Sequence, residues 1–391
     1  MSAHALSNLV CRCFTLAMVA LVHPAIGFGA DAALTPIRTY IGTYTRADGS
    51  QGIYQAELNP TNGALKLFSV AGEAKNPSFL ALPPRNKFLY AVSEVDDYDD
   101  SHGGALSAFS VDAASGKLAL LNHQSSGGSG PCFVSVDDAG KNALVANYGG
   151  GSVAVLPIDA AGKLEPASCF IQHEGSGPDK SRQEGPHAHC IKLDAANRFA
   201  LACDLGLDKV FIYRFDGATG QLTASDQPWM ETEPGAGPRH LAFHPSGKWV
   251  YIVNELNSTL TAAAYNGEAG TLKSLQSLST LPAGGVPGNS GAEVVAHPNG
   301  KFVYSSNRGH DSIAMFAIDQ QSGKITSLGQ HPIGGKTPRN FNIDPSGKFL
   351  LAAAQDSDRI VVHAIDQATG KLTQTDHAID VPMPVCIKFA P

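Results

Sequence analysis

From residue 36 onward, short apolar stretches alternate with turn sequences along the chain. A typical unit begins at an x-Pro pair, runs through one apolar stretch, turns at a sequence such as PSGK and continues into a second. The stretches are rich in β-branched and aromatic residues, which favours strands over helices. Clear copies of the unit are residues 76–94, 130–148, 237–255 and 337–355.

A second signature, Gly-x-Leu or Gly-x-Ile, recurs seven times between these units. Its glycines are Gly63, Gly116, Gly162, Gly220, Gly270, Gly323 and Gly370, at spacings of 46 to 58 residues. That period is typical of a four-stranded propeller blade. Each blade should contain a first strand after x-Pro, a second after the Lys/Arg turn, a third ending in Ile/Val-Asp and a fourth starting at Gly-x-Leu.

The two ends of the chain complement each other. Residues 37–45 resemble a second strand, and residues 384–389 resemble a first strand. One blade would then be completed by both termini, which closes the ring and leaves no unpaired sheet edge. We therefore predict an all-β fold over residues 33–391, a seven-bladed β-propeller of four-stranded blades.

Residues 1–32 have the pattern of a signal peptide. Arg12 precedes the apolar run 13–22, and Ala30-Asp-Ala32 forms an A-x-A cleavage pattern. The run is too short to span a bilayer, so no membrane anchor is expected. This pattern predicts a periplasmic or secreted protein.

Charge and cysteine content exclude several classes of function. The net charge of −7 comes without a basic stripe, so nucleic acid is not an expected partner. The five cysteines beyond the leader form no C-x-x-C motif, and no metal-ligand spacing occurs, so neither metal nor cofactor is expected. Cys190 and Cys203 should lie nearly opposite each other on paired strands, which leaves open whether they form a disulfide.

Comparison of the blades with one another points to one rim of the channel. The start of the first strand and the end of the second share that rim because the two form an antiparallel hairpin. Core positions repeat Phe, Leu, Val and Ala, whereas the rim positions vary in chemistry. The second strands end at Glu94, Tyr148, Leu205, Glu255, Arg308 and Gln355; the first strands begin with Ser78, Cys132, His187 and His189, Arg239, Ala292 and Glu293, and Arg339.

Five of these residues are the candidate catalytic group: Arg239, Glu255, Arg308, His187 and His189. Arg239 and Glu255 are symmetric about the hairpin turn, so they should be neighbours across two strands. Guanidinium groups suit carbonyl or anionic oxygens because their donors form a fixed fork. A purely structural Arg239–Glu255 ion pair stays an alternative. The candidate substrate-binding residues around the group are Tyr148, His240, Asn254, Glu293, His310 and Arg339.

Four segments carry a resemblance to a known family. Residues 185–189 (GPHAH), 237–258 (GPRH…NEL), 306–313 (SNRGHDSI) and 337–357 resemble the lactonase-type seven-bladed β-propeller family. That family includes propeller 6-phosphogluconolactonases and carboxy-cis,cis-muconate cyclases, and the resemblance spans residues 36–391. It implies that His187 or His189, with Arg239, Glu255 and Arg308, lines an active cleft.

The resemblance implies hydrolysis of a sugar lactone, with or without a phosphate. Glu255 would be the general base, provided that its pKa and geometry suit. Arg239 and Arg308 would hold the carbonyl or an anion, and His187 or His189 would protonate the departing alkoxide. Two alternatives stay open: a muconate-type lactone cycloisomerase, and a propeller that binds a ligand or protein without catalysis. The sequence predicts no oligomeric state.

Overall fold

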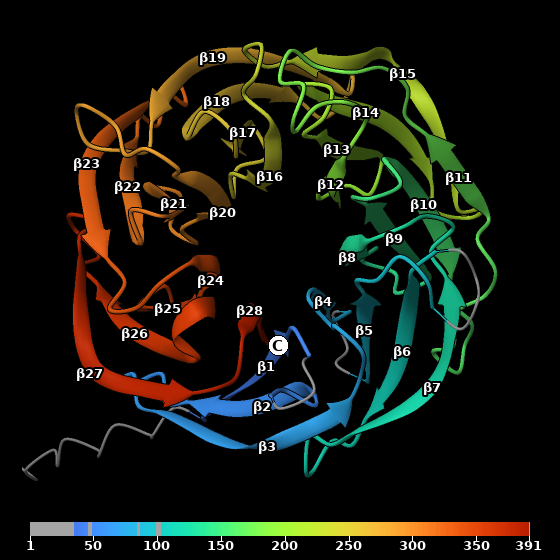
Figure 1. Cartoon of the computed structure of the whole chain (residues 1–391), viewed down its shortest axis with the longest axis horizontal. Coiled ribbons are helices and arrows are strands. Elements are labelled where there is room, and N and C mark those ends of the chain that lie inside the picture. The colour runs from blue at the N-terminus through green and yellow to red at the C-terminus, as the bar shows by residue number, and fades with distance from the viewer. Residues whose placement is uncertain (1–34, 46–48, 84–86, 99–102, 391) are drawn as a thin grey trace, which may run out of the picture. The chain divides into compact units, whose positions relative to one another are not determined.

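The structure is a computed structural model that describes residues 35–45, 49–83, 87–98 and 103–390. The predicted signal peptide, residues 1–32, lies outside the described residues. The compact unit Leu34–Pro391 contains seven four-stranded antiparallel sheets arranged as blades around a central channel (Figure 1). The predicted all-β seven-bladed propeller is therefore confirmed. Within the described part of the chain, no helix has the length and apolar character that crossing a membrane requires.

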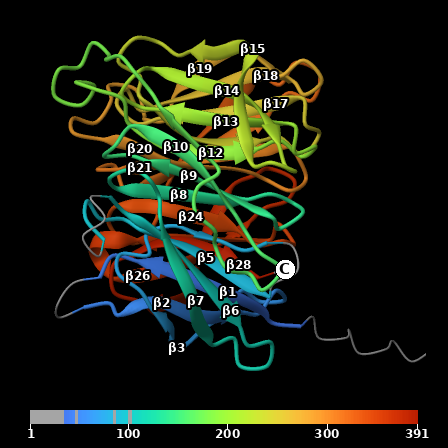
Figure 2. The same ribbon diagram turned by 90° about the vertical axis from the view of Figure 1, so that its right-hand side faces the viewer.

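In every blade the first strand lies nearest the channel and the fourth lies on the outer wall (Figure 1). Figure 2 shows the same blades from the side. Blade 1 consists of β28 (Pro384–Phe389), β1 (Ile37–Thr43), β2 (Gly52–Leu58) and β3 (Leu65–Glu73), and blade 2 of β4 (Leu80–Ala81), β5 (Phe88–Ser93), β6 (Ala105–Val111) and β7 (Leu118–Ser125). Blade 3 consists of β8 (Pro131–Val136), β9 (Asn142–Asn147), β10 (Ser152–Pro157) and β11 (Cys169–Gln172), and blade 4 of β12 (Ala188–Leu193), β13 (Phe199–Asp204), β14 (Lys209–Asp216) and β15 (Gln221–Glu231).

Blades 5 to 7 repeat the same order. Blade 5 consists of β16 (Pro238–Phe243), β17 (Trp249–Asn254), β18 (Thr259–Asn266) and β19 (Thr271–Ser279). Blade 6 consists of β20 (Ser290–Ala296), β21 (Phe302–Arg308), β22 (Ser312–Ile318) and β23 (Ile325–Pro332). Blade 7 consists of β24 (Pro338–Ile343), β25 (Phe349–Ala354), β26 (Arg359–Ile365) and β27 (Leu372–Asp380). A single 3₁₀ turn, η1 (Gln355–Ser357), follows β25.

Blade 1 is shared by the two termini, as predicted. β1 pairs antiparallel with β28, with Thr39 opposite Phe389 and Ile41 opposite Ile387. The sequence placed one strand wrongly: the fourth strand of blade 3 begins at Cys169 and not at Gly162. Pro166 lies between the two positions, and proline has no N–H to donate to a strand ladder.

Contacts between neighbouring blades explain the seven repeated glycines. All seven have φ between 66° and 84°, a region that disfavours side chains. In five blades a Cβ on the glycine would lie 2.1 to 2.6 Å from a ring carbon at the start of the preceding blade's second strand. The five pairs are Gly63–Phe349, Gly162–Phe88, Gly270–Phe199, Gly323–Trp249 and Gly370–Phe302.

Buried tyrosines add hydrogen bonds at three of these junctions and at the junction of blades 1 and 2. Tyr hydroxyl groups donate to repeat-glycine carbonyls of the next blade in four places: Tyr40 to Gly116 (2.8 Å), Tyr90 to Gly162 (3.0 Å), Tyr251 to Gly323 (3.2 Å) and Tyr304 to Gly370 (2.9 Å). Together, the glycine–aromatic contacts and these hydrogen bonds join all neighbouring blades except blades 3 and 4.

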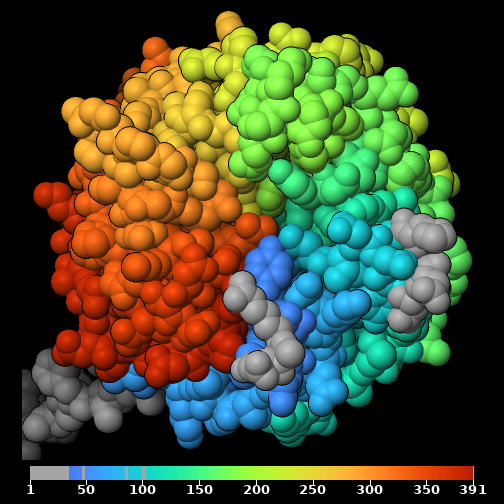
Figure 3. Space-filling model, in the orientation of Figure 1, coloured from blue at the N-terminus to red at the C-terminus, as the bar shows by residue number. Residues whose placement is uncertain are grey.

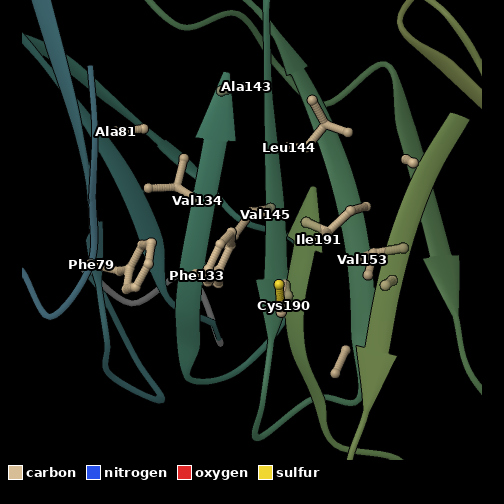
Figure 4. Packing of buried hydrophobic residues seen from close by; sticks show 14 of the residues in the cluster. Phe79, Ala81, Phe133, Val134, Ala143, Leu144, Val145, Val153, Cys190 and Ile191 are labelled. Atoms are coloured by element: carbon tan, nitrogen blue, oxygen red, sulfur yellow. The ribbon is translucent and has the colours of Figure 1, made fainter. Parts of the chain in front are cut away.

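Aromatic side chains fill the middle of the channel. Phe79 and Phe133 come from neighbouring blades and lie side by side (Figure 4), with their ring centroids 4.1 Å apart. The His240 ring packs edge-on against both, at 5.6 and 5.1 Å. The ribbon leaves the centre open, but in the space-filling view blue, orange and green side chains meet around it (Figure 3).

The glycine–aromatic contact can be tested by adding one methyl group. Gly270→Ala places a Cβ 2.1 Å from the Phe199 ring, whereas Gly247→Ala has a similar φ (68° against 66°) and no atom within 4 Å. Both variants share the backbone strain, so the difference reports packing alone. We expect Gly270→Ala to lower the free energy of unfolding by about 1–3 kcal/mol more than Gly247→Ala in urea titrations. Equal losses would contradict the packing explanation.

Candidate functional site

β-Bulges in the innermost strands bring side chains to one mouth of the channel. The pairing register skips a residue after Pro131, Ala188, Pro238 and Pro338. A bulge re-aims the side chain of the extra residue. The four skipped residues are Cys132, His189, Arg239 and Arg339.

The space between these side chains is small. Cys132, Arg239 and Arg339 line a cavity of about 10 Å³ together with Ser78 and Glu94. That volume holds about one water molecule. Glu94, one of the lining residues, directly follows β5 and so lies at the rim where the second strands end.

Glu255, just after β17, binds three guanidinium groups at this rim. Its Oε2 lies 2.9 Å from Arg239 Nε and 2.9 Å from Arg308 Nη2, and its Oε1 accepts a 2.7 Å hydrogen bond from Arg182 Nη2. The side chain is only 6% exposed. Burial alone would raise the pKa of Glu255, but Arg308, Arg239 and Arg182 lower it to about 2. Glu255 is therefore a carboxylate that anchors cations.

Two of the arginines are also held by the backbone of blade 6. Arg239 Nη1 donates to the Ala292 carbonyl (2.6 Å), and Arg308 Nη2 donates to the Gly291 carbonyl (2.9 Å). Arg239 is 2% exposed and Arg308 is 16% exposed. Burial lowers the pKa of Arg308 to about 10, so it stays protonated at neutral pH.

The third arginine, Arg182, was missed by the sequence analysis. It lies between β11 and β12, and its Nη2 also donates to the Tyr148 hydroxyl (3.2 Å). The adjacent Gln183 is fully buried and anchors this segment through the Leu205 carbonyl and the Asp208 carboxylate, both at 2.8 Å. A signal was present, because the spacing from Gly162 to Gly220 is the longest in the repeat.

The two candidate histidines have different surroundings. His187 stacks on the Tyr148 ring at 4.5 Å, and its Nδ1 lies 2.9 Å from the Tyr148 carbonyl oxygen. A carbonyl only accepts, so Nδ1 carries the proton and Nε2 of the neutral ring can accept one. Nε2 lies 3.6 Å from Glu184 Oε1.

His189 lies deeper, with its Nδ1 3.5 Å from Cys132 Sγ. Burial and the Arg239 charge hold the pKa of His189 well below its usual value, so the ring is neutral. The structure therefore separates the pair that the sequence left undecided: His187 faces the rim and His189 belongs to the channel wall.

Two of the remaining predicted ligand-binding residues lie in a buried layer below the mouth. His240 Nδ1 lies 3.0 Å from Glu293 Oε1, and Asn340 Nδ2 donates to Glu293 Oε2 (2.6 Å). Burial lowers the pKa of His240 to about 3; burial raises that of Glu293, but His240 and nearby lysines bring it to about 2. This network braces the strands beneath the site.

Two other predicted substrate-binding residues, Asn254 and His310, contact side chains of nearby residues in their own blades. Asn254 donates to the hydroxyl groups of Thr259 and Thr261, at 2.8 and 2.9 Å. His310 Nδ1 lies 2.7 Å from Ser312 Oγ. The structure does not bring Asn254 or His310 into the Glu255 cluster, whereas Tyr148 joins it through Arg182.

Glu94 forms a second carboxylate cluster, which includes Arg339. Both Glu94 oxygens lie 2.9 Å from the Tyr44 hydroxyl, and the Ser78 hydroxyl donates to Oε2. Arg339 Nη2 lies 3.8 Å from Glu94 Oε1. Tyr44 follows β1 as Glu255 follows β17, but the sequence comparison missed it because that blade is split between the termini.

Neither a metal centre nor a disulfide is formed by the described residues. They contain no group of three or more His, Cys, Asp or Glu side chains placed to hold a metal ion. Cys190 and Cys203 are register partners on β12 and β13, as predicted, and both are free thiols.

Comparison with known proteins finds one matching family and several similar proteins. Residues 38–389 match the family described as "Lactonase, 7-bladed beta-propeller". The chain is 38% identical over 350 residues to a 6-phosphogluconolactonase of Bacillus subtilis, covering 90% of this chain and 97% of that protein.

Two solved structures are also similar. One, from Bacteroides fragilis, is 36% identical with a TM-score of 0.86, covering 93% of this chain and 100% of that chain. The other, described as a periplasmic gluconolactonase of Pseudomonas aeruginosa, is 31% identical with a TM-score of 0.85, covering 91% of this chain and 99% of that chain.

The lowered pKa of Glu255 predicts a pH-dependent cost of replacing it. The folded-state pKa of about 2 lies below the ordinary value of 4.5, so the charge contributes stability above pH 4.5 that is lost as pH falls towards 2. Glu255→Gln should therefore lower the free energy of unfolding at pH 7 by on the order of 3 kcal/mol, and the difference from wild type should shrink by pH 3. A difference that is constant with pH, in urea titrations, would contradict the three-arginine arrangement.

Proposed function

Because the chain belongs to the seven-bladed lactonase β-propeller family, we propose that it hydrolyses the ring ester of a sugar lactone at this channel mouth. The observation that carries the proposal is the convergence of Arg182, Arg239 and Arg308 on Glu255. Tyr148 links Arg182 to His187, so this cation lies near an imidazole whose Nδ1 is already bonded and whose Nε2 can accept a proton.

The more exposed guanidinium groups would bind the lactone carbonyl. Arg182 is 40% exposed and Arg308 16% exposed, whereas Arg239 is nearly inaccessible. Their N–H groups would stabilise the oxyanion that forms when water attacks the carbonyl carbon. Because the three cations share one counter-charge, positive charge remains available for that oxyanion. Arg239 would hold Glu255 in place from beneath.

His187 would move the protons. Its Nε2 takes a proton from the attacking water as the water oxygen bonds to the carbonyl carbon. When the intermediate collapses, the ester C–O bond breaks and the imidazolium returns the proton to the leaving alkoxide. One water is consumed and the product is a hydroxy acid.

This proposal revises two expectations from the sequence. A carboxylate with a pKa of about 2 and guanidinium groups on both oxygens is a weak proton acceptor at neutral pH. Glu255 is therefore assigned to holding the arginines, and the role of general base passes to His187. His189, buried in the channel wall, is assigned no proton transfer.

We also propose that the protein acts in the periplasm or outside the cell. The pattern of residues 1–32 supports export. The similar Pseudomonas aeruginosa protein is itself described as periplasmic. Fractionation of cells that produce the full chain tests this: the shortened protein should appear in the periplasm or medium, and retention of the full-length chain in the cytoplasm would contradict export.

Titration of released acid tests the activity and the base together. Purified protein should release one acid equivalent per lactone across a panel of aldonolactones with and without phosphate. His187→Gln should lower kcat by about 10²- to 10⁴-fold, as for loss of a general base. His377→Gln, on outer strand β27, is the matched control and should retain full activity.

The outcomes separate the two claims. Absence of turnover across the panel by the wild-type protein would refute the lactonase proposal. Wild-type turnover with an equally active His187→Gln variant would refute only the assignment of the base.

A further inference from the structure

One guanidinium at the mouth lacks the partners that hold the other three. Within the described part of the chain, the Arg339 guanidinium donates no hydrogen bond to a protein acceptor, and its neighbours are one carboxylate and one aromatic ring. The distance from Arg339 Nη2 to Glu94 Oε1 is 3.8 Å, and the Arg339 guanidinium carbon lies 5.4 Å from the centre of the Tyr44 ring. The side chain is 18% exposed, so its donors can reach a ligand.

The Glu94 carboxylate has hydrogen-bond acceptor positions that no protein donor among the described residues uses. It follows β5 as Glu255 follows β17, but its hydrogen-bonding neighbours are two neutral hydroxyl groups, from Tyr44 and Ser78. Burial raises the pKa of Tyr44, so the phenol keeps its proton and donates it. The two hydroxyl protons use about two of the roughly four acceptor positions of a carboxylate. The Glu94 side chain is 21% exposed, so the remaining positions can reach a ligand.

Together these groups suit a hydroxyl group better than an anion. A ligand hydroxyl can donate to Glu94 and accept from Arg339 at the same time, whereas the Glu94 charge would repel a phosphate or carboxylate. The small cavity beneath holds about one water, so the ligand would lie across the rim rather than deeper. Arg239 lines the same cavity, which connects this cluster to the Glu255 cluster.

We propose that Arg339, Glu94 and Tyr44 form the specificity subsite that recognises ring hydroxyl groups of a polyhydroxylated lactone. The inference rests on the proposed function, because it places the ester of the same ligand on the Glu255 cluster. Glu94 and Tyr44 thereby become specificity-determining residues, beyond the arginines and histidines that the sequence motifs indicate.

Binding of two unreactive lactams tests the subsite without turnover. Gluconolactam carries the ring hydroxyl groups and δ-valerolactam lacks them. In calorimetry, the wild-type protein should bind gluconolactam more tightly, and Glu94→Gln should reduce the ratio of the two affinities by about 10- to 100-fold, as for loss of a hydrogen bond to a charged group. Tyr44→Phe should reduce it in the same direction. Glu231→Gln, an exposed carboxylate at the end of β15, should leave the ratio unchanged.

Each outcome bears on one claim. A wild-type protein that does not prefer gluconolactam, or a Glu94→Gln variant that is folded by circular dichroism and keeps the wild-type ratio, would overturn the subsite. If lactones are still hydrolysed in that case, the proposed function stands. If gluconolactam binding is selective and depends on Glu94 but no lactone is hydrolysed, the subsite stands and the proposed function fails.

Discussion

The candidate site depends on one buried carboxylate that neutralises part of a concentrated positive charge. Glu255 contacts Arg239 of its own hairpin, Arg308 of the next blade and Arg182 of the segment before blade 4. Buried guanidinium groups without a counter-charge would be strongly unfavourable. One carboxylate does not cancel three cations, however, and the surplus is what can attract a developing oxyanion. Stability and the proposed chemistry therefore rely on the same contact.

The contact of Glu255 with the three arginines requires that the blades keep fixed positions relative to one another. The repeated glycines admit aromatic rings from the preceding blade, and the pairing of β28 with β1 closes the circle. Bulges then turn Arg239 and Arg339 out of the strand register and into the channel mouth. The aromatic layer of Phe79 and Phe133 fills the channel beneath. The scaffold thus sets both the position of the charges and the depth at which a ligand stops.

Much of this arrangement could be predicted from the sequence because it repeats locally. The glycine spacing reports a contact made in blade after blade, and the Arg239–Glu255 pair follows from hairpin symmetry. Arg182 could not be placed, since its segment has no counterpart in other blades. The pKa of Glu255 depends on three distant segments converging, so a general base was a reasonable expectation that the three-dimensional charges do not support. The different roles assigned to His187 and His189 likewise depend on how deeply each ring is buried, which the sequence does not show.

Hydrolysis in water enriched in ¹⁸O tests the central claim, that the arginine-lined mouth directs water at a lactone carbonyl. Mass spectrometry of the product after a single turnover should find one solvent oxygen in the carboxylate of each hydroxy acid formed. A product that has the mass of the lactone and carries no solvent oxygen would show isomerisation instead, and would contradict the account.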